Sequence, residues 1–182
     1  SKGILTSREI QAIYQAYKIK EIIDSNEYKN KNILEIGGGL GRTAYYCYKF
    51  GIKNYTLVDL LIPRICQINY LSRLINEKKI ISKPKLSNFY QKNVKVVSPQ
   101  LLFSNDVTFD LVFNSDSFTE IDFTNQKKYH KYLKKNSKIF FSINHENNHY
   151  RVSDYFDTKN LSNYSKNLYW LRRGYVEEIF KF

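Results

Sequence analysis

The sequence has few of the residues that stabilise small extracellular proteins or cross membranes. Its 182 residues include two cysteines, three prolines, one tryptophan and no methionine. Cys47 and Cys66 both fall within expected helices, so we predict two small buried side chains rather than a disulfide or a metal pair. No apolar run approaches the roughly 18 residues of a membrane span, and no charged-then-apolar leader is present. We therefore expect a cytoplasmic protein with no membrane span.

Methionine is missing even at position 1. We therefore expect the sequence to differ from a direct translation product, and a lost methionine would shorten the spacing around it by one residue. A chain of this length can bury one core, and no segment has the composition of a linker. We predict one domain over residues 1–182.

The charge of the chain is strongly positive. Its 29 Lys and Arg residues against 17 Asp and Glu give a formal net charge of +12. Such an excess suits a nucleic-acid partner, but the lysines are scattered, with short clusters at 78–79, 127–128 and 134–135. An AT-rich genome also encodes much Lys, Asn, Ile and Tyr. The net charge is therefore compatible with a nucleic-acid partner, and equally with acidic or phosphorylated small substrates.

The most informative segment is Asn32-Ile-Leu-Glu-Ile-Gly-Gly-Gly-Leu-Gly-Arg42. Its apolar residues predict a buried strand, which runs into a glycine-rich turn, and a helix is expected to begin at Arg42. Glycines permit close backbone approaches that side chains forbid. A helix N-terminus directs free N–H groups and the positive end of its dipole at the turn. The segment predicts a site for a nucleotide-type cofactor, the alternative being a turn that binds nothing.

The glycine spacing separates the cofactor classes. Dinucleotide-binding folds use G-x-G-x-x-G, with the third glycine inside the helix; counted from Gly37 and Gly39, that position is Arg42. The sequence instead has Glu35 two residues before the first glycine, which resembles motif I of the class I S-adenosylmethionine (SAM) methyltransferases. Asp59 ends the next apolar run, where a carboxylate can accept hydrogen bonds from both ribose hydroxyls. Its alternative role is to cap the following helix.

Alternating apolar runs and amphipathic segments predict an α/β fold. We expect helices over 6–25, 42–50, 63–76 and 126–133, strands over 32–36, 54–59, 94–97, 109–114 and 138–144, and a terminal hairpin of 167–172 and 175–182. Thr6-x-x-Glu9 predicts a capping box for a helix within 1–26 that covers the cofactor cleft. The expected apolar sides of the helices at 6–25 and 63–76 are Ile10, Ile13, Tyr14, Tyr17 and Ile22, and Ile65, Ile68, Leu71, Leu74 and Ile75. Together these elements predict a Rossmann-like class I methyltransferase fold, with a mostly parallel seven-stranded sheet, a C-terminal antiparallel hairpin and helices on both faces.

Catalytic candidates follow the fourth and fifth expected strands, because ligands of open α/β sheets bind outside the carboxyl ends of the strands. These residues are 114–120 and 144–146. His145 is the first candidate for a general base, since imidazole titrates near neutral pH. Asp116 is the rival base, or it orients an acceptor hydroxyl or binds a divalent cation. The simpler alternatives are a loop histidine without a role and a loop-capping aspartate.

Several segments carry a more specific resemblance. Leu34–Arg42, Val58–Leu60 with the nearby Gln67, Asp110–Glu120 and Phe141–Asn144 occur in order. Together they resemble the sugar O-methyltransferases of polysaccharide and glycosylated natural-product gene clusters, over roughly residues 30–146. Two positions depart from that family. No proline directly follows Leu60, and Ile121 stands where a methionine is expected, as a lost methionine would produce.

The resemblance implies SAM as cofactor, S-adenosylhomocysteine (SAH) as product and a sugar or glycoside as acceptor. A metal requirement and a homo-oligomer both stay open. The implied cofactor-binding residues are Glu35, Gly37, Gly38, Gly39, Gly41, Arg42, Asp59, Leu60, Ser98, Asn114 and Ser115.

Three other functions compete with this one. Methyltransferases of base amino groups usually carry Asn/Asp-Pro-Pro-Tyr/Phe where this chain has Asn114-Ser-Asp-Ser117, which leaves ribose methylation and other RNA targets open. A non-catalytic SAM-fold binding subunit is a second alternative. A nicotinamide-dependent oxidoreductase is the least favoured, because the third glycine and a Tyr-x-x-x-Lys pair near the fifth strand are missing.

Overall fold

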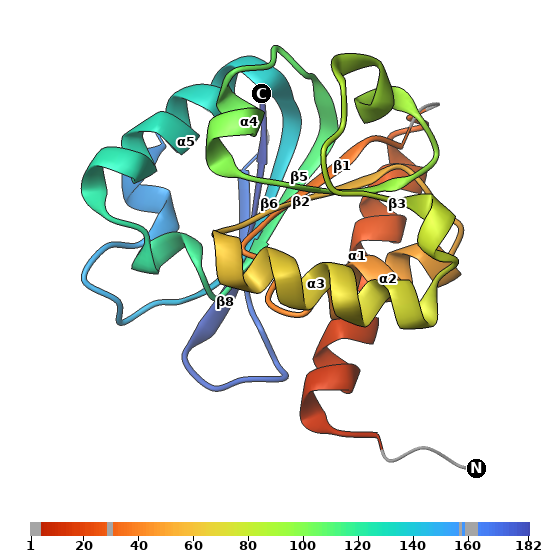
Figure 1. The fold of residues 1–182 in the computed structure, drawn as a ribbon. Helices are drawn as coiled ribbons and strands as arrows, with labels where there is room; N and C mark the ends of the chain where they lie inside the picture. The colour runs from red at the N-terminus through yellow and green to blue at the C-terminus, as the bar shows by residue number, and fades with distance from the viewer. Residues whose placement is uncertain (1–4, 29–30, 157, 159–163) are drawn as a thin grey trace.

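A mixed sheet forms the centre of the molecule. The computed structural model describes residues 5–28, 31–156, 158 and 164–182, and within them eight strands lie in the order β3-β4-β2-β1-β5-β6-β8-β7 (Figure 1). The strands are β1 (Ile33–Ile36), β2 (Tyr55–Val58), β3 (Ile80–Ile81), β4 (Val94–Val97), β5 (Phe109–Ser115), β6 (Ser137–His145), β7 (Tyr164–Leu168) and β8 (Tyr175–Lys181). Neighbours pair in parallel except at β6–β8 and β8–β7. The mostly parallel sheet and its C-terminal antiparallel hairpin are confirmed.

Two details of the sheet differ from the prediction. The two-residue strand β3 adds an eighth strand beside β4, in a segment whose polar, aromatic-dotted sequence gave no clear periodicity. The first hairpin strand spans Tyr164–Leu168 rather than 167–172. Residues 169–174 instead form a turn, in which the Arg172 backbone N–H donates to the Tyr169 carbonyl at 3.2 Å.

Helices cover both faces of the sheet, as predicted (Figure 1). They are α1 (Ser7–Ser25), α2 (Arg42–Lys49), α3 (Leu61–Leu74), α4 (Pro99–Phe103) and α5 (Phe123–Asn136), with short 3-10 turns at Glu77–Lys79, Leu86–Tyr90, Phe118–Glu120 and Val152–Tyr155. One apolar core joins α1, α2 and α3 to the sheet, and a second joins α4 and α5 to its other face. Alternate strand residues supply the two cores, because successive side chains of a strand point to opposite faces.

The predicted apolar sides of two helices were partly wrong. Helix α1 buries Ala12, Gln15, Ala16, Ile19, Ile22 and Ile23, so its buried face is rotated from the predicted one. Helix α3 buries Leu71, but Ile65 is 58% exposed and Leu74 is also exposed. The helix is apolar on several sides, so a 3.6-residue period does not select one face. Cys47 is buried as predicted, whereas Cys66 is exposed.

The capping box at the start of α1 is confirmed, with the Thr6 backbone N–H donating to Glu9 Oε2 at 3.2 Å. In the described part of the chain, no helix combines the length and apolar composition needed to cross a bilayer.

Candidate functional site

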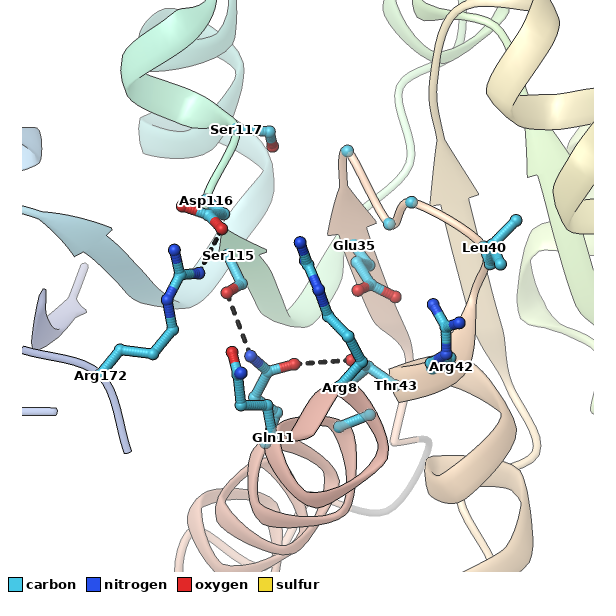
Figure 2. A pocket seen from close by; sticks show the side chains of 15 residues that line it. Arg8, Gln11, Glu35, Leu40, Arg42, Thr43, Ser115, Asp116, Ser117 and Arg172 are labelled. Atoms are coloured by element: carbon cyan, nitrogen blue, oxygen red, sulfur yellow. Dashed lines mark hydrogen bonds and ion pairs between the residues drawn. The ribbon is translucent and has the colours of Figure 1, made fainter. Parts of the chain in front are cut away.

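Two cavities lie at the carboxyl edge of the parallel strands, and both are lined by Gly37 and Ser117. The first, here called the turn cavity, has a volume of about 200 Å³ and lies between the glycine turn, α1 and the end of β5 (Figure 2). The second, here called the Asp59 cavity, has a volume of about 500 Å³. It is lined by Asp59, Leu60, Pro99, Gln100, Phe103 and Tyr129, among other residues. The shared wall makes the two cavities neighbours at one edge of the sheet.

Among the glycines of the turn, only Gly39 has open space where a side chain would project. Gly37, Gly39 and Gly41 adopt φ angles of +70°, +55° and +84°, which side chains rarely allow. A Cβ on Gly37 would lie 2.0 Å from Ser117 Oγ, so Gly37 is needed for packing within the protein. A Cβ on Gly39 would meet no atom within 4 Å. Gly39 therefore borders free space, and Gly41 is the N-cap of α2.

A buried carboxylate lies beneath this turn. Glu35 is 3% exposed, lines the turn cavity and accepts a hydrogen bond of 3.0 Å from the Tyr55 hydroxyl. Burial, with a smaller contribution from the nearby charge of Asp59, raises the pKa of Glu35 to about 8. A positively charged ligand group in the cavity would stabilise the ionised form. Glu35 is thus placed to balance a positive charge in the turn cavity.

Asp59, on the wall of the Asp59 cavity, is held by Gln67. The Gln67 Nε2 atom donates to Asp59 Oδ2 at 2.9 Å and to the Gly39 carbonyl at 3.1 Å. Burial raises the pKa of Asp59. The N-cap of α3 is Leu60, and Asp59 Oδ1 accepts from its backbone N–H at 2.8 Å, so Asp59 also contacts the start of this helix although it is not the N-cap residue. Leu60 lines the Asp59 cavity while 69% exposed, as an apolar surface available to a planar ligand.

Helix α1 contributes a polar face that the sequence analysis missed. Its residues at the turn cavity are Arg8, Gln11, Ala12 and Gln15, spaced three and four apart on one face. Gln15 Nε2 donates to Ser115 Oγ at 3.1 Å, and its Oε1 accepts from Thr43 Oγ1 at 2.8 Å. Arg8 extends into the cavity between Ser115 and Glu35 (Figure 2). The only signal for these residues was the polar stripe on a helix expected to cover the cleft.

Two of the three arginines at the turn cavity are neutralised within the described residues. Arg42 Nε donates to Glu9 at 2.8 Å, so this predicted cofactor ligand also ties α2 to the start of α1. Arg172 pairs with Asp116. No ion pair of the described chain involves Arg8, which makes Arg8 the free cation of this cavity.

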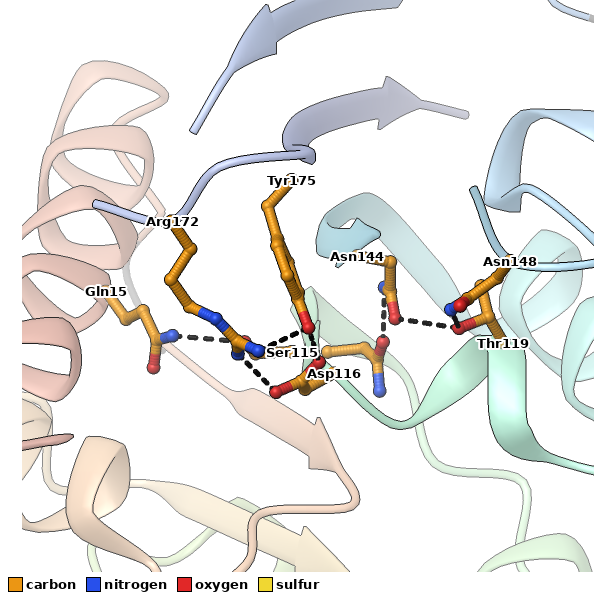
Figure 3. A network of polar contacts seen from close by, with 9 residues as sticks. Gln15, Ser115, Asp116, Thr119, Asn144, Asn148, Arg172 and Tyr175 are labelled. Carbon is orange, nitrogen blue, oxygen red and sulfur yellow. Dashed lines mark hydrogen bonds and ion pairs between the residues drawn. The ribbon is translucent and has the colours of Figure 1, made fainter. Parts of the chain in front are cut away.

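Asp116 lies on the cavity wall, held by the C-terminal hairpin (Figure 3). Its φ of +67° is a left-handed conformation that aspartate tolerates better than most residues. The Arg172 guanidinium donates to Oδ2, and the Tyr175 hydroxyl donates to Oδ1 at 2.5 Å. Both carboxylate oxygens are therefore engaged. Arg172 and Tyr175 were missed because they lie 56 and 59 residues from Asp116 and belong to no local motif.

Several predicted cofactor residues organise the walls. Asn114 is fully buried and donates to the Ile36 carbonyl at 2.8 Å and to Ser117 Oγ at 2.6 Å. The Ser98 hydroxyl caps α4 by accepting from the Leu101 N–H at 3.2 Å. The next residue, Pro99, lines the Asp59 cavity. Ser115 lines the turn cavity directly, as do Gly38 and Arg42. Asn114 and Ser98 thus position the residues that line the cavities.

His145 lies at the end of β6, on the wall of neither cavity. Its Nδ1 accepts a hydrogen bond of 3.1 Å from the Asn147 N–H, and its ring packs edge-on against Tyr175. A Cβ on Gly174 would lie 2.6 Å from His145 Nε2, so this ring closely approaches the hairpin backbone. His145 and Asp116 therefore do not face one cavity. Across the described residues, no three His, Cys, Asp or Glu side chains are grouped to hold a metal ion.

Comparison with known proteins identifies the fold. No family model and no curated protein matches the chain. Among solved structures, it is similar to PigF with SAH, at a TM-score of 0.62 and 11% identity over 95% of this chain and 56% of that one. It is also similar to PH1948 from Pyrococcus horikoshii, named as an RNA methyltransferase, at a TM-score of 0.58 and 14% identity over 96% of this chain and 81% of that one.

A third similar structure is the glycopeptide N-methyltransferase MtfA complexed with sinefungin, with a TM-score of 0.50 and 16% identity. The match covers 71% of this chain and 53% of MtfA, so it spans about half of that protein's length. At these identities the likeness establishes the fold, which is the Rossmann-like fold of methyltransferases, as the sequence predicted.

Proposed function

We propose that the chain is a SAM-dependent O-methyltransferase that acts on a hydroxyl group of a sugar or glycoside. The observation that carries the cofactor assignment is the pair of adjoining cavities, one beside Glu35 and Gly39 and the other beside Asp59. SAM has a charged methionine part and a nucleoside part, which need two such neighbouring sites. The open space over Gly39 and the buried acid Glu35 fit the first part, and Asp59 with Leu60 fits the second.

The charges of the turn cavity suit the methionine part in particular. Among the described residues, Arg8 is the cation of this cavity without an ion pair, and we assign it to the α-carboxylate. Glu35 would stabilise the positive charge of the amino group or the sulfonium. In the other cavity, Asp59 would accept from the ribose hydroxyls through its remaining lone pairs. Leu60 would cover one face of the adenine.

When bound, SAM supplies an activated methyl group on a sulfonium sulfur. The chain has to align an acceptor hydroxyl with that methyl and receive its proton as the new C–O bond forms and the S–C bond breaks. Asp116 is the better placed of the two predicted groups, because it lines the turn cavity. Arg172 and Tyr175 each occupy one lone pair on one of its two oxygens, and the second lone pair of each oxygen is left for the acceptor proton. His145 would first have to release the Asn147 N–H from its Nδ1 before this atom could take a proton.

The sugar acceptor is supported by the resemblance carried by residues 110–120 and 141–144. RNA methylation is the second candidate, favoured by the net charge of +12. The experiment that separates them supplies SAM with a labelled methyl group and offers methyl glycosides, nucleotide sugars or total RNA as acceptors. Label in a sugar fraction supports the proposal, and label only in RNA contradicts it.

The same assay tests the proton acceptor. We expect Asp116→Asn to lower turnover at least tenfold while SAH affinity stays within about threefold. His145→Ala should retain most turnover. A loss of turnover in His145→Ala with normal SAH affinity would return His145 to the role of base.

A further inference from the structure

Three aromatic rings form an exposed cluster in the segments that follow β5 and β6. We call this cluster the aromatic platform. Phe123 begins α5, while His149 and Tyr150 lie in the segment after β6. The Phe123 and Tyr150 rings stack with centroids 6.2 Å apart, and the His149 ring meets Tyr150 edge-on at 4.5 Å. Phe123 is 51% exposed and Tyr150 is 40% exposed. The platform is therefore accessible to a ligand.

The platform rests on the core of the protein. Tyr150 packs on Tyr155 with centroids 6.2 Å apart, and Tyr155 packs on Phe118 at the same separation. Phe118 is fully buried, and the Tyr155 hydroxyl donates to Gln126 of α5. A ladder of rings thus supports the exposed ones from below. Exposed apolar area held in one place favours a ligand that covers it, because little ordering is needed on binding.

A series of polar contacts begins at Asn148, the neighbour of His149 in sequence, and continues through Thr119 to Asn144 (Figure 3). Asn148 donates to Thr119 Oγ1 at 2.5 Å. Thr119 Oγ1 lies 3.5 Å from Asn144 Oδ1, and Asn144 Nδ2 donates to Asn114 Oδ1 at 2.8 Å. Asn114 lies two residues before Asp116. Asn144 and Asn114 are buried, so this series fixes the segment after β6, which carries Asn148, relative to the loop after β5, which carries Thr119 and Asp116. Of its members, only Thr119 and Asn148 are open to a ligand.

The charges around the platform disfavour a polyanion. Three exposed carboxylates lie in the segments that form it, at Glu120, Asp122 and Asp154. Three cations of the same segments balance them: Lys127, whose Nζ lies 4.2 Å from the Phe123 ring centroid, Lys128 and Arg151. A phosphate backbone requires an excess of positive charge along its path. This surface instead suits an uncharged ligand with both apolar and hydroxyl-bearing sides.

We propose that the aromatic platform binds the sugar ring of the acceptor, with a C–H face of the pyranose on Tyr150 and its hydroxyls on Asn148 and Thr119. This inference rests on the proposed function, since it assigns the acceptor subsite of the same catalytic edge. Aromatic rings stack on apolar faces, and amides both donate to and accept from hydroxyls. Together they account for recognition of a neutral sugar.

Saturation-transfer NMR on the full chain with excess SAH tests the platform, using the methyl glycosides of glucose, galactose, mannose and rhamnose as probes. We expect transfer to the ring C–H protons of at least one glycoside. Tyr150→Ala should reduce it at least fivefold, whereas Tyr150→Phe should retain it, because stacking needs the ring and not the hydroxyl. Tyr90→Ala is the matched control, since Tyr90 is an exposed tyrosine on neither cavity.

Thermal unfolding of each variant and its calorimetric affinity for SAH accompany the NMR. Normal unfolding and normal SAH affinity in Tyr150→Ala, with lost glycoside transfer, would support the platform. Equal transfer in wild type and Tyr150→Ala, or none to any glycoside in an SAH-saturated wild type, would overturn it. A Tyr150-dependent signal for a single-stranded RNA alone would also overturn it. Glycoside binding without SAH binding would keep the platform while contradicting the proposed cofactor.

Discussion

Gln67 holds Asp59 in place, with its Nε2 donating to Asp59 Oδ2 at 2.9 Å. The same nitrogen donates to the carbonyl of Gly39, so one fully buried side chain joins the acid of β2 to the turn after β1. The two halves of the proposed cofactor site are thus fixed relative to each other by α3. Charge-assisted hydrogen bonds of this kind are stronger than neutral ones.

The first prediction concerns this link. Gln67→Leu should lower SAH affinity about tenfold, equivalent to about 1.4 kcal/mol, because Asp59 Oδ2 and the Gly39 carbonyl both lose the Gln67 donor. Asp59 is then left held through Oδ1 by the Leu60 N–H. Isothermal titration with SAH provides the measurement. Asn69→Ala is the control, since Asn69 is exposed on the same helix. Unchanged affinity in Gln67→Leu would show that Asp59 needs no support from α3.

The second prediction concerns the pH dependence of stability caused by Glu35. Its pKa of about 8 in the folded protein lies above the ordinary value of 4.5, so the folded state binds more protons between these two pH values. Stability from this group is fully present below pH 4.5 and is lost as the pH rises through 8. Glu35→Gln mimics the protonated acid and should therefore become progressively more stable than wild type, by about 1.4 kcal/mol per pH unit.

Denaturant unfolding of both proteins at pH 5.5 and 7.5, without ligand, measures this difference. Subtracting the two proteins removes the contributions of all other titrating groups. A pH-independent difference would mean that Glu35 is not perturbed by burial. The same variant should bind SAH more weakly, because it cannot balance a positive charge in the turn cavity.

The third prediction concerns Lys95, whose contribution to stability changes with pH in the direction opposite to that of Glu35. Lys95 in β4 is fully buried, with its Nζ donating to the Gln91 carbonyl at 3.0 Å and to Asn54 Oδ1. Burial lowers its pKa from 10.5 to about 7, so the folded state binds fewer protons between these values and stability rises with pH. Lys95→Met should therefore be more stable than wild type at pH 7. This advantage should shrink by about 1.4 kcal/mol per pH unit up to pH 10, as followed by urea unfolding. An advantage that grows with pH would contradict the assignment.

Local sequence patterns predicted the strand, turn and helix around residues 35–42 better than the contacts around Asp116. The residues from Glu35 to Arg42 lie within one strand–turn–helix unit, so their spacing alone fixes their neighbours. Gln15 reaches Ser115 across 100 residues of sequence, and Arg172 reaches Asp116 across 56. No local periodicity encodes such contacts, which depend on how α1 and the hairpin pack on the sheet. His145 was predicted at the correct strand end, but its place against Gly174 depended on the course of the hairpin.

The methionine part of SAM is assigned to the space over Gly39. Isothermal titration of SAH into wild type, Gly39→Ala and Gly51→Ala tests this assignment most directly. Both glycines have positive φ, and a Cβ on either meets no atom within 4 Å, so both variants should lose a similar stability of about 1 kcal/mol. Gly51 lines neither cavity. We predict that wild type and Gly51→Ala bind SAH and that Gly39→Ala binds at least tenfold more weakly. No binding to wild type, or equal binding to both variants, would contradict the account.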